Sequence, residues 1–357
     1  MESFGKAFKS ATDLAFETVE DVHSVELVIA NISIRLSATD STLLEVFTDS
    51  LTQHVVPDST ATLHKDRTAE IRIWSSRATG VGRPELPAAI RQRIIARRAD
   101  LAPGADYQID FDPTGRMLTL MDPRSGNVDV CLTDIKSLPQ WERAAPLRSA
   151  LGWILRRNDR YLIHAAAVSN TTGAALLLGA GGAGKSTTSL RCRQEGMGFI
   201  GDDICIIAPE SPPRVFNLYG SAKTVWSDRG RFPDLDQYLV TDPTLSEYKA
   251  VYSINRIPDH RIVNSSALCV LIFIDRTLPV GRSEPVDPAR VVATVASSTA
   301  SFLPGSGRPM LAALSEIARL LPVIRLSVGQ DPVRVAQLIN SAIDRNAPSV
   351  LSDASAR

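Results

Sequence analysis

The chain has 357 residues, of which 44% are hydrophobic and 22% are charged. These values are typical of a globular protein, and the length is enough for two domains of ordinary size. Its 39 Lys and Arg residues balance 39 Asp and Glu residues, giving a formal net charge of +0. This balance argues against nucleic acid or an anionic membrane surface as the main partner.

The cysteines exclude two common kinds of small domain. Cys131, Cys192, Cys205 and Cys269 are far apart and form no C-x-x-C pair, so neither a zinc site nor a disulfide scaffold is indicated. We expect buried thiols in a reducing compartment. Because no apolar run is long enough to cross a membrane and no long apolar stretch follows Met1, the sequence predicts a soluble, cytoplasmic protein.

The first 145 residues predict an α+β domain. Residues 1 to about 20 are expected to form an arm or a short helix, and the partial alternation over 25–36 predicts one strand or two short ones. Ser41 is expected to cap a helix. Four further strands are predicted, the last three as an antiparallel meander, at 69–74, 107–111, 117–121 and 128–132. No catalytic constellation appears here, and substrate recognition is one candidate role for the domain.

A basic segment inside this domain has two interpretations. Residues 90–98 contain several arginines, which invites a nucleic-acid interpretation. However, acidic residues flank the segment and no aromatic residues interleave with it. A helix with a solvated basic face and with Ile90, Ile94 and Ile95 turned inward is therefore favoured.

A phosphate-binding P-loop lies at the centre of the chain. An apolar run at 174–178 leads into the pattern G-x-x-x-x-G-K-S, and a helix is expected from Lys185 to Glu195, ended by Gly196. The order of strand, loop and helix places a phosphate at a helix N-terminus, where unpaired N–H groups favour an anion. The nucleotide-binding residues predicted from this motif are Gly179, Ala180, Gly181, Gly182, Ala183, Gly184, Lys185, Ser186 and Thr187.

Two polar features flank the P-loop. A single strand is expected over 161–168, and His164 on this apolar segment, taken alone, is more often structural than catalytic. Downstream, Asp202 and Asp203 are adjacent between apolar runs, where a nucleotide-binding domain keeps its magnesium ligand and its hydroxyl-orienting carboxylate. Successive side chains on a strand face opposite sides, so both carboxylates can serve one ligand only if the strand bends, and a strand junction at Gly201 would supply the bend. The alternative is that Gly201, Asp202 and Asp203 simply form a turn.

The remainder predicts loops and then an α/β end. Residues 209–265 have the composition of loops that shape the mouth of a site. Their candidate phosphate or substrate contacts are Lys223, Arg229, Arg231, Arg256 and Arg261. A very apolar strand is expected at 267–274 and another strand at 323–326. Helices are expected from Pro288, Pro309 and Pro332, with Asp287 and Asp331 capping the first and the last.

Read together, His164, the P-loop and the Asp pair resemble the catalytic domain of the HPr kinase/phosphorylase family, which shares its fold with phosphoenolpyruvate carboxykinases. In that family the histidine lies fifteen positions before the first P-loop glycine, and the Asp pair begins seventeen after the lysine. His164 to Gly179 and Lys185 to Asp202 reproduce both intervals. The resemblance covers about 150–210 well. By layout alone, the first 145 residues resemble the variable front halves of related kinases from peptide natural-product clusters, including lasso-peptide kinases.

The resemblance implies roles for these residues. Lys185 would bind the β- and γ-phosphates of ATP, Ser186 would ligate Mg²⁺, and Asp202 would assist either at the metal or at the catalytic base. Asp203 would be the general base toward a serine hydroxyl, and His164 would tune or orient the acid–base site. The family's Glu-x-Arg signature has no counterpart, since only Ser227-Asp228-Arg229 lies near that distance, so the resemblance does not extend to a second metal contact or to reverse phosphorolysis.

The sequence thus predicts an α/β protein with a P-loop kinase domain of HPr kinase/phosphoenolpyruvate carboxykinase type at 146–345, preceded by a smaller α+β domain at 1–145 and followed by a disordered tail at 346–357. The expected activity is ATP-dependent phosphorylation of a serine on a small protein or peptide. A kinase acting on free serine or a related metabolite, and a non-catalytic NTP-binding regulatory protein, stay open as alternatives. No nucleic acid or membrane partner is expected. HPr kinases are hexamers, which leaves a homo-oligomer open.

Overall fold

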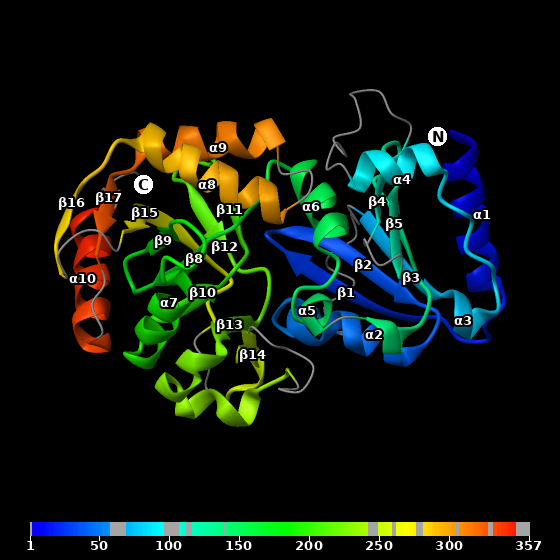
Figure 1. Ribbon diagram of the computed structural model, residues 1–357, viewed down its shortest axis with the longest axis horizontal. Helices are drawn as coiled ribbons and strands as arrows, with labels where there is room; N and C mark the ends of the chain where they lie inside the picture. The colour runs from blue at the N-terminus through cyan, green and yellow to red at the C-terminus, as the bar shows by residue number, and fades with distance from the viewer. Residues whose placement is uncertain are drawn as a thin grey trace, which may run out of the picture.

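The computed structural model describes residues 2–57, 69–95, 107–111, 116–138, 140–241, 249–258, 262–275, 281–303, 307–327 and 331–347. The predicted turn at 112–115, Arg261 and the predicted tail from residue 348 onward lie outside these ranges. The protein is a mixed α/β structure with two main sheets, the first built from the N-terminal part of the chain (Figure 1).

The first sheet has six strands in the order β1-β2-β3-β6-β5-β4. Parallel pairs join β2 to β3 and β3 to β6, whereas the β6-β5-β4 part is the antiparallel meander that the turn residues predict. The residues at 25–36 form two strands rather than one, because Ala30 and Asn31 turn the chain with φ angles of 50° and 67°. The strands are β1 (His23–Ile29), β2 (Ile32–Ala38), β3 (Ala69–Ser75), β4 (Gln108–Phe111), β5 (Met117–Met121) and β6 (Val128–Leu132).

Two predictions about the N-terminal helices need correction. The first residues form a full helix, α1, in which Phe4 and Phe8 are buried close to Trp74 of β3. The cap of α2 is Asp40 rather than Ser41, because the Asp40 carboxylate accepts the N–H of Leu43. The helices of this half are α1 (Glu2–Glu17), α2 (Ser41–Thr48), η1 (Asp49–His54), α3 (Ser76–Thr79), α4 (Ala88–Ile95), η3 (Ile135–Ser137) and α5 (Gln140–Ala144).

The second sheet has nine strands, and its main path runs β10-β8-β9-β15-β12-β11-β7. Its centre is parallel, because β15 pairs in parallel with both β9 and β17. The separate pair β13-β14 forms a small antiparallel ribbon. The strands are β7 (Tyr161–Ile163), β8 (Ala166–Ser169), β9 (Ala174–Leu178), β10 (Gly198–Gly201), β11 (Cys205–Ala208), β12 (Arg214–Phe216), β13 (Ser221–Val225), β14 (Lys249–Ser253), β15 (Ser265–Ile274), β16 (Ser283–Pro285) and β17 (Val323–Leu326).

Helices cover both faces of the second sheet. Alternate residues of the P-loop strand β9 contribute to different cores: Leu176 packs with α8 and α9, and Leu177 packs with α10. Such a strand, buried on both faces, is a continuous apolar run, which is why 174–178 is recognisable in the sequence. The helices are α6 (Arg148–Arg156), α7 (Lys185–Gln194), η4 (Trp226–Arg231), η5 (Pro233–Tyr238), η6 (Ile254–Arg256), α8 (Pro288–Phe302), α9 (Gly307–Leu320) and α10 (Pro332–Arg345).

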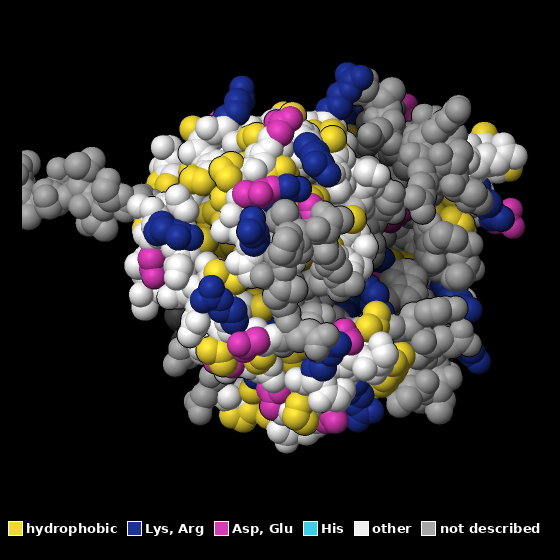
Figure 2. Space-filling model, turned by 60° about the vertical axis from the view of Figure 1, so that its left-hand side comes forward, with side chains coloured by type: hydrophobic (Ala, Val, Ile, Leu, Met, Phe, Trp, Pro, Cys, Tyr) yellow, Lys and Arg dark blue, Asp and Glu magenta, His cyan; other side chains and the backbone are white. Residues whose placement is uncertain are grey.

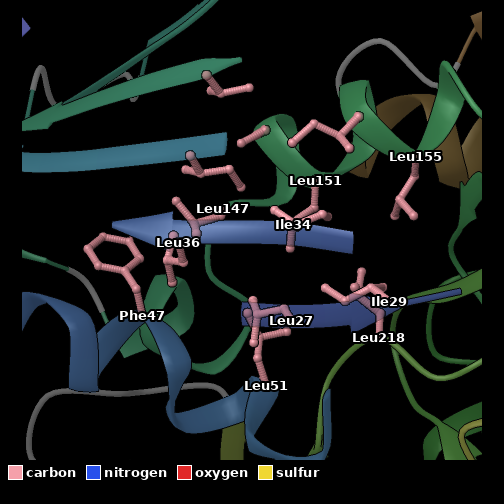
Figure 3. Packing of buried hydrophobic residues seen from close by; sticks show 14 of the residues in the cluster. Leu27, Ile29, Ile34, Leu36, Phe47, Leu51, Leu147, Leu151, Leu155 and Leu218 are labelled. Carbon is pink, nitrogen blue, oxygen red and sulfur yellow. The ribbon is translucent and has the colours of Figure 1, made fainter. Parts of the chain in front are cut away.

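A continuous apolar core joins the two halves. Leu151 and Leu155 of α6 pack with Ile34 of β2 in the cluster that also contains Leu218 (Figure 3). The side chain of His54 is buried nearby, with Nε2 3.1 Å from the carbonyl oxygen of Leu218. The domain boundary expected at residue 145 stays a prediction, and α6, directly after it, packs on the first sheet.

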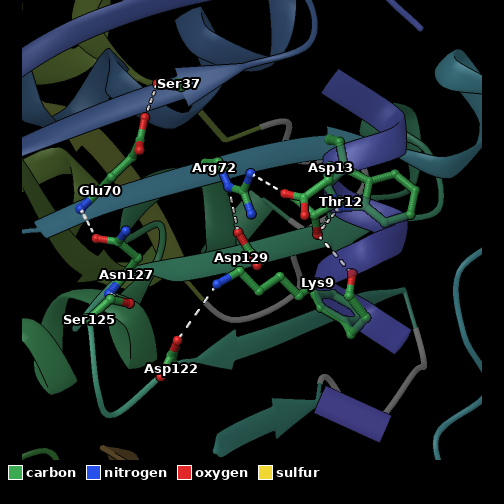
Figure 4. A network of polar contacts seen from close by, with 12 residues as sticks. Lys9, Thr12, Asp13, Ser37, Glu70, Arg72, Asp122, Ser125, Asn127 and Asp129 are labelled. Carbon is green, nitrogen blue, oxygen red and sulfur yellow. Dashed lines mark hydrogen bonds and ion pairs between the residues drawn. The ribbon is translucent and has the colours of Figure 1, made fainter. Parts of the chain in front are cut away.

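The other face of the first sheet carries a polar network (Figure 4). Arg72 of β3 donates to the buried carboxylate of Asp129 at 2.8 Å and to Asp13 of α1 at 2.7 Å. Lys9 lies 3.8 Å from Asp122. The guanidinium of Arg72 compensates the charge of the buried Asp129 carboxylate. Because the same guanidinium also binds Asp13, it holds α1 on the sheet.

On the surface, the charges are mixed. In the view of Figure 2, basic side chains are spread among acidic and apolar ones, and the described part of this face carries no patch of a single sign. Among the residues that the structure describes, no helix combines the length and apolar character needed to span a membrane. All four cysteines are buried and free, as predicted.

Candidate active site

The glycine-rich loop at 179–184, which the sequence predicts to be a P-loop, lies between the end of β9 and the start of α7. Gly182 and Gly184 have φ angles of 75° and 106°, a left-handed conformation that a side chain would strain. Helix α7 begins directly after Gly184, and no side chain caps its N-terminus. Its first N–H groups are therefore available to an anion.

The side chain of Lys185 folds back over this loop. Its Nζ donates to the carbonyl oxygens of Gly179 at 2.9 Å and Ala180 at 3.2 Å. Burial lowers the pKa of Lys185, whereas the carboxylates of Asp202 and Asp203 raise it. The P-loop lysine and the Asp pair thus share one electrostatic environment, although they are seventeen positions apart.

The chain turns sharply at the Asp pair. The N–H of Ile204 donates to the carbonyl oxygen of Asp202 at 2.8 Å, and Asp203 between them has a φ of 69°. This is a γ-turn, a strained conformation for a residue with a side chain. Strand β10 ends at Gly201, where the sequence predicts a junction, and the turn at Asp203 separates it from β11, which begins at Cys205. The two carboxylates therefore do not lie on one continuous strand.

Asp202 is the more deeply buried member of the pair. Its Oδ2 accepts the backbone N–H of Lys223 at 2.9 Å, whereas Oδ1 has no hydrogen-bond partner within the described ranges. Burial and the neighbouring charge of Asp203 raise the pKa of Asp202, and the Lys223 N–H and the Ser186 hydroxyl oppose that rise. One carboxylate oxygen thus remains unused beside the P-loop serine.

Asp203 has a different environment. Its Oδ2 lies 2.6 Å from Nζ of Lys223, and its Oδ1 lies 4.0 Å from Nε2 of His164. Burial raises the pKa of Asp203, but the Lys223 ammonium, with smaller effects of His164 and Lys249, opposes that rise, and the pKa is lowered. Two adjacent carboxylates therefore have pKa values shifted in opposite directions, an arrangement that favours different roles for each.

His164 lies at a break in the chain, which corrects the single strand expected over 161–168. Strand β7 ends at Ile163 and β8 begins at Ala166, so the backbone between them leaves the sheet. The N–H of His164 donates instead to Oγ1 of Thr299 on α8, at 3.2 Å. Burial, followed by the charge of Lys185, lowers the pKa of His164 to about 4, so the imidazole is neutral at pH 7.

The structure therefore brings His164, Lys185, Asp202 and Asp203 together, while their catalytic roles stay predictions. Of the candidate cations that the structure describes, only Lys223 is placed at the Asp pair. The described arginines of that group form ion pairs elsewhere: Arg229 with Asp236, Arg231 with Asp228 and Arg256 with Asp49. Thr299 is the site residue that sequence reasoning missed, and no motif marks it.

The donor set suits a hard cation better than a transition metal. Within the described ranges no cluster of three or more His, Cys, Asp or Glu side chains could enclose a metal ion. Mg²⁺ is ordinarily held by one or two carboxylates or hydroxyls together with phosphate oxygens and water. The unused Asp202 Oδ1, with the Ser186 hydroxyl close enough to affect the pKa of Asp202, fits that requirement.

Comparisons with known proteins give limited information. No protein-family model matches the chain, and no curated protein matches it. Among solved structures, the HPr(Ser) kinase/phosphatase from Coxiella burnetii is similar at 14% identity over 50% of this chain and 88% of that chain, with a TM-score of 0.28.

Proposed function

We propose that the chain is an ATP-dependent kinase that transfers the γ-phosphate to a serine hydroxyl of a small protein or peptide. The observation that carries the proposal is the position of Asp203. Its carboxylate lies on a strained γ-turn, is held ionised by Lys223, and interacts electrostatically with the P-loop residue Lys185. Strained residues with shifted pKa values concentrate at functional sites.

The donor would bind at the P-loop. The uncapped N-terminus of α7 and the loop amides would accept the phosphates, and the Lys185 ammonium would leave the carbonyls of Gly179 and Ala180 for the β- and γ-phosphates. Ser186 and Asp202 would hold Mg²⁺, which neutralises phosphate charge when bound. Charge neutralisation and alignment are the main requirements of phosphoryl transfer.

The acceptor would bind beside Asp203. A serine hydroxyl is a weak nucleophile at neutral pH, so a positioned carboxylate that accepts its proton assists the transfer. The serine oxygen would bond to the γ-phosphorus, the bond from that phosphorus to the β–γ bridging oxygen would break, and the hydroxyl proton would pass to Asp203. Neutral His164, 4.0 Å from Asp203, would orient the carboxylate without competing as a cation.

The test uses the full chain with Mg²⁺ and γ-labelled ATP. A panel of serine-containing peptides is offered beside the same peptides with alanine in place of serine, and beside free serine. The proposal expects label in a serine peptide, none in its alanine counterpart, and none with Lys185→Ala. Label that moves only to free serine would show a small-molecule kinase, and nucleotide binding without any transfer would show a regulatory NTP-binding protein; either result would overturn the proposal.

A further inference from the structure

One residue outside the motifs holds both members of the Asp pair. The backbone N–H of Lys223 donates to Oδ2 of Asp202 at 2.9 Å, while its ammonium lies 2.6 Å from Oδ2 of Asp203. Lys223 is itself buried, with 8% of its surface exposed. A lysine is seldom buried to this extent unless it is paired with an acidic group. The contact with the Asp pair therefore accounts for the burial of Lys223.

The two carboxylate oxygens of Asp203 have different neighbours. Oδ2 is occupied by the Lys223 ammonium, and Oδ1 faces Nε2 of His164 at 4.0 Å, which is longer than a hydrogen bond. A hydroxyl group that approaches Oδ1 from beside the imidazole would reach the carboxylate directly. The salt bridge therefore selects which oxygen can meet an acceptor.

We propose that Lys223 is a positioning residue of this site: its ammonium holds Oδ2 of Asp203, so that Oδ1 is left to receive the proton of the acceptor hydroxyl. This inference rests on the proposed kinase function. This role makes the ribbon β13-β14 part of the site, because Lys223 lies on β13 and contacts Asp202 and Asp203.

The charge arrangement supports this role. Asp202 and Asp203 are adjacent and buried, with 3% and 8% of their surfaces exposed, and two carboxylates placed in this way need a compensating cation in contact with them. Among the cations that affect Asp203, Lys223 is dominant, and Lys249 on the paired strand β14 has a weaker effect through an exposed side chain. Lys249 therefore provides a matched control on the same ribbon.

The test compares Lys223→Met, Lys223→Gln and Lys223→Arg with Lys249→Met. The pH dependence of kcat/KM for phosphoryl transfer is measured between pH 4 and 8, together with Mg·ATP binding. For the two uncharged variants we expect the acidic limb to move upward by about one pH unit or more. Lys223→Arg should keep the limb near its wild-type position, and Lys249→Met should move it much less.

A purely structural role would lower the rate equally at every pH, and that result would overturn the inference. A second measurement does not depend on turnover: the ¹³C resonance of the Asp203 carboxyl, assigned by comparison with Asp203→Asn, is titrated in the wild type and in Lys223→Gln. The inference expects a higher titration midpoint in the variant, and an unchanged midpoint would contradict it. A wild-type protein that transfers no phosphate would refute the proposed function, while the titration would still decide the Lys223–Asp203 relationship.

Discussion

Thr299 holds the backbone of His164, although 135 positions separate the two residues. The N–H that would pair within a continuous strand donates instead to Oγ1 of Thr299, whose side chain is fully buried on α8. Helix α8 therefore fixes the break between β7 and β8, and through that break the place of the imidazole beside Asp203. The position of a P-loop site residue thus depends on a helix from the far end of the chain.

Replacement of Thr299 tests this dependence. Thr299→Val keeps the shape of the side chain but removes the acceptor, leaving the N–H of His164 unpaired in a largely buried place. We expect a loss of about 1–2 kcal/mol in the free energy of unfolding, measured by urea denaturation. The rate of phosphoryl transfer should fall as well, because the imidazole is no longer held.

Two control variants separate the hydrogen bond from other effects. Thr299→Ser retains the hydroxyl and should recover most of the lost stability. Thr294→Val alters a partly exposed threonine of the same helix and should change stability by less than about 0.5 kcal/mol. Equal losses for Thr299→Val and Thr299→Ser would show that the hydroxyl is not the stabilising group.

His54 predicts a dependence of stability on pH. Burial lowers its pKa to about 4 from the ordinary 6.5, so the folded protein binds fewer protons than the unfolded chain between these values. Stability is therefore fully present above pH 6.5 and is lost as the pH falls toward 4, by about 3 kcal/mol for this residue. His164, with a pKa also lowered to about 4, acts in the same direction.

The contribution of His54 can be isolated with His54→Gln, which removes the titrating group. The difference in the free energy of unfolding between pH 7 and pH 4 should shrink by about 3 kcal/mol in this variant. Urea denaturation at both pH values gives the comparison directly. The same difference in wild type and variant would mean that His54 does not titrate with a lowered pKa.

Asp202→Asn should stabilise the protein while it disables the site. Folding raises the pKa of Asp202 above its ordinary value of 3.8. The ionised carboxylate therefore lowers the free energy of unfolding at neutral pH, and this destabilisation disappears as the pH falls through the raised pKa. Asparagine has nearly the same shape and no charge, so we expect a gain of about 1 kcal/mol at pH 7 that fades toward pH 4. Transfer that depends on Mg²⁺ should be lost. A variant less stable than the wild type at pH 7 would contradict this account of Asp202.

Local signals explain what the sequence predicts correctly. The P-loop, its apolar strand and its helix occupy one short segment, and each part has its own pattern. The caps are equally local: the Asp287 carboxylate accepts the N–H of Ala289, and that of Asp331 accepts the N–H of Val333, each with proline at the start of the helix. Such features need no knowledge of the rest of the fold.

The features that position the site are not local. The break at His164 depends on Thr299, and the place of Lys223 depends on how the ribbon β13-β14 packs, so neither follows from its neighbours in sequence. The sequence predicts a bend next to the Asp pair, but the left-handed φ of 69° at Asp203 has no signal in the neighbouring residues. Lys223 has one local signal, which is its position among the small residues Ser221, Ala222 and Thr224. This signal does not mark Lys223 as a more probable site residue than the four candidate arginines.

The central claim is that Asp203 accepts the proton of the serine hydroxyl. Asp203→Asn keeps the size of the side chain and removes its basicity, so single-turnover transfer from γ-labelled ATP to a serine peptide should fall by about 100-fold or more, with Mg·ATP still bound by the P-loop. Transfer measured on the variant and the wild type at equal nucleotide saturation decides the question. An undiminished rate in Asp203→Asn would contradict the assignment.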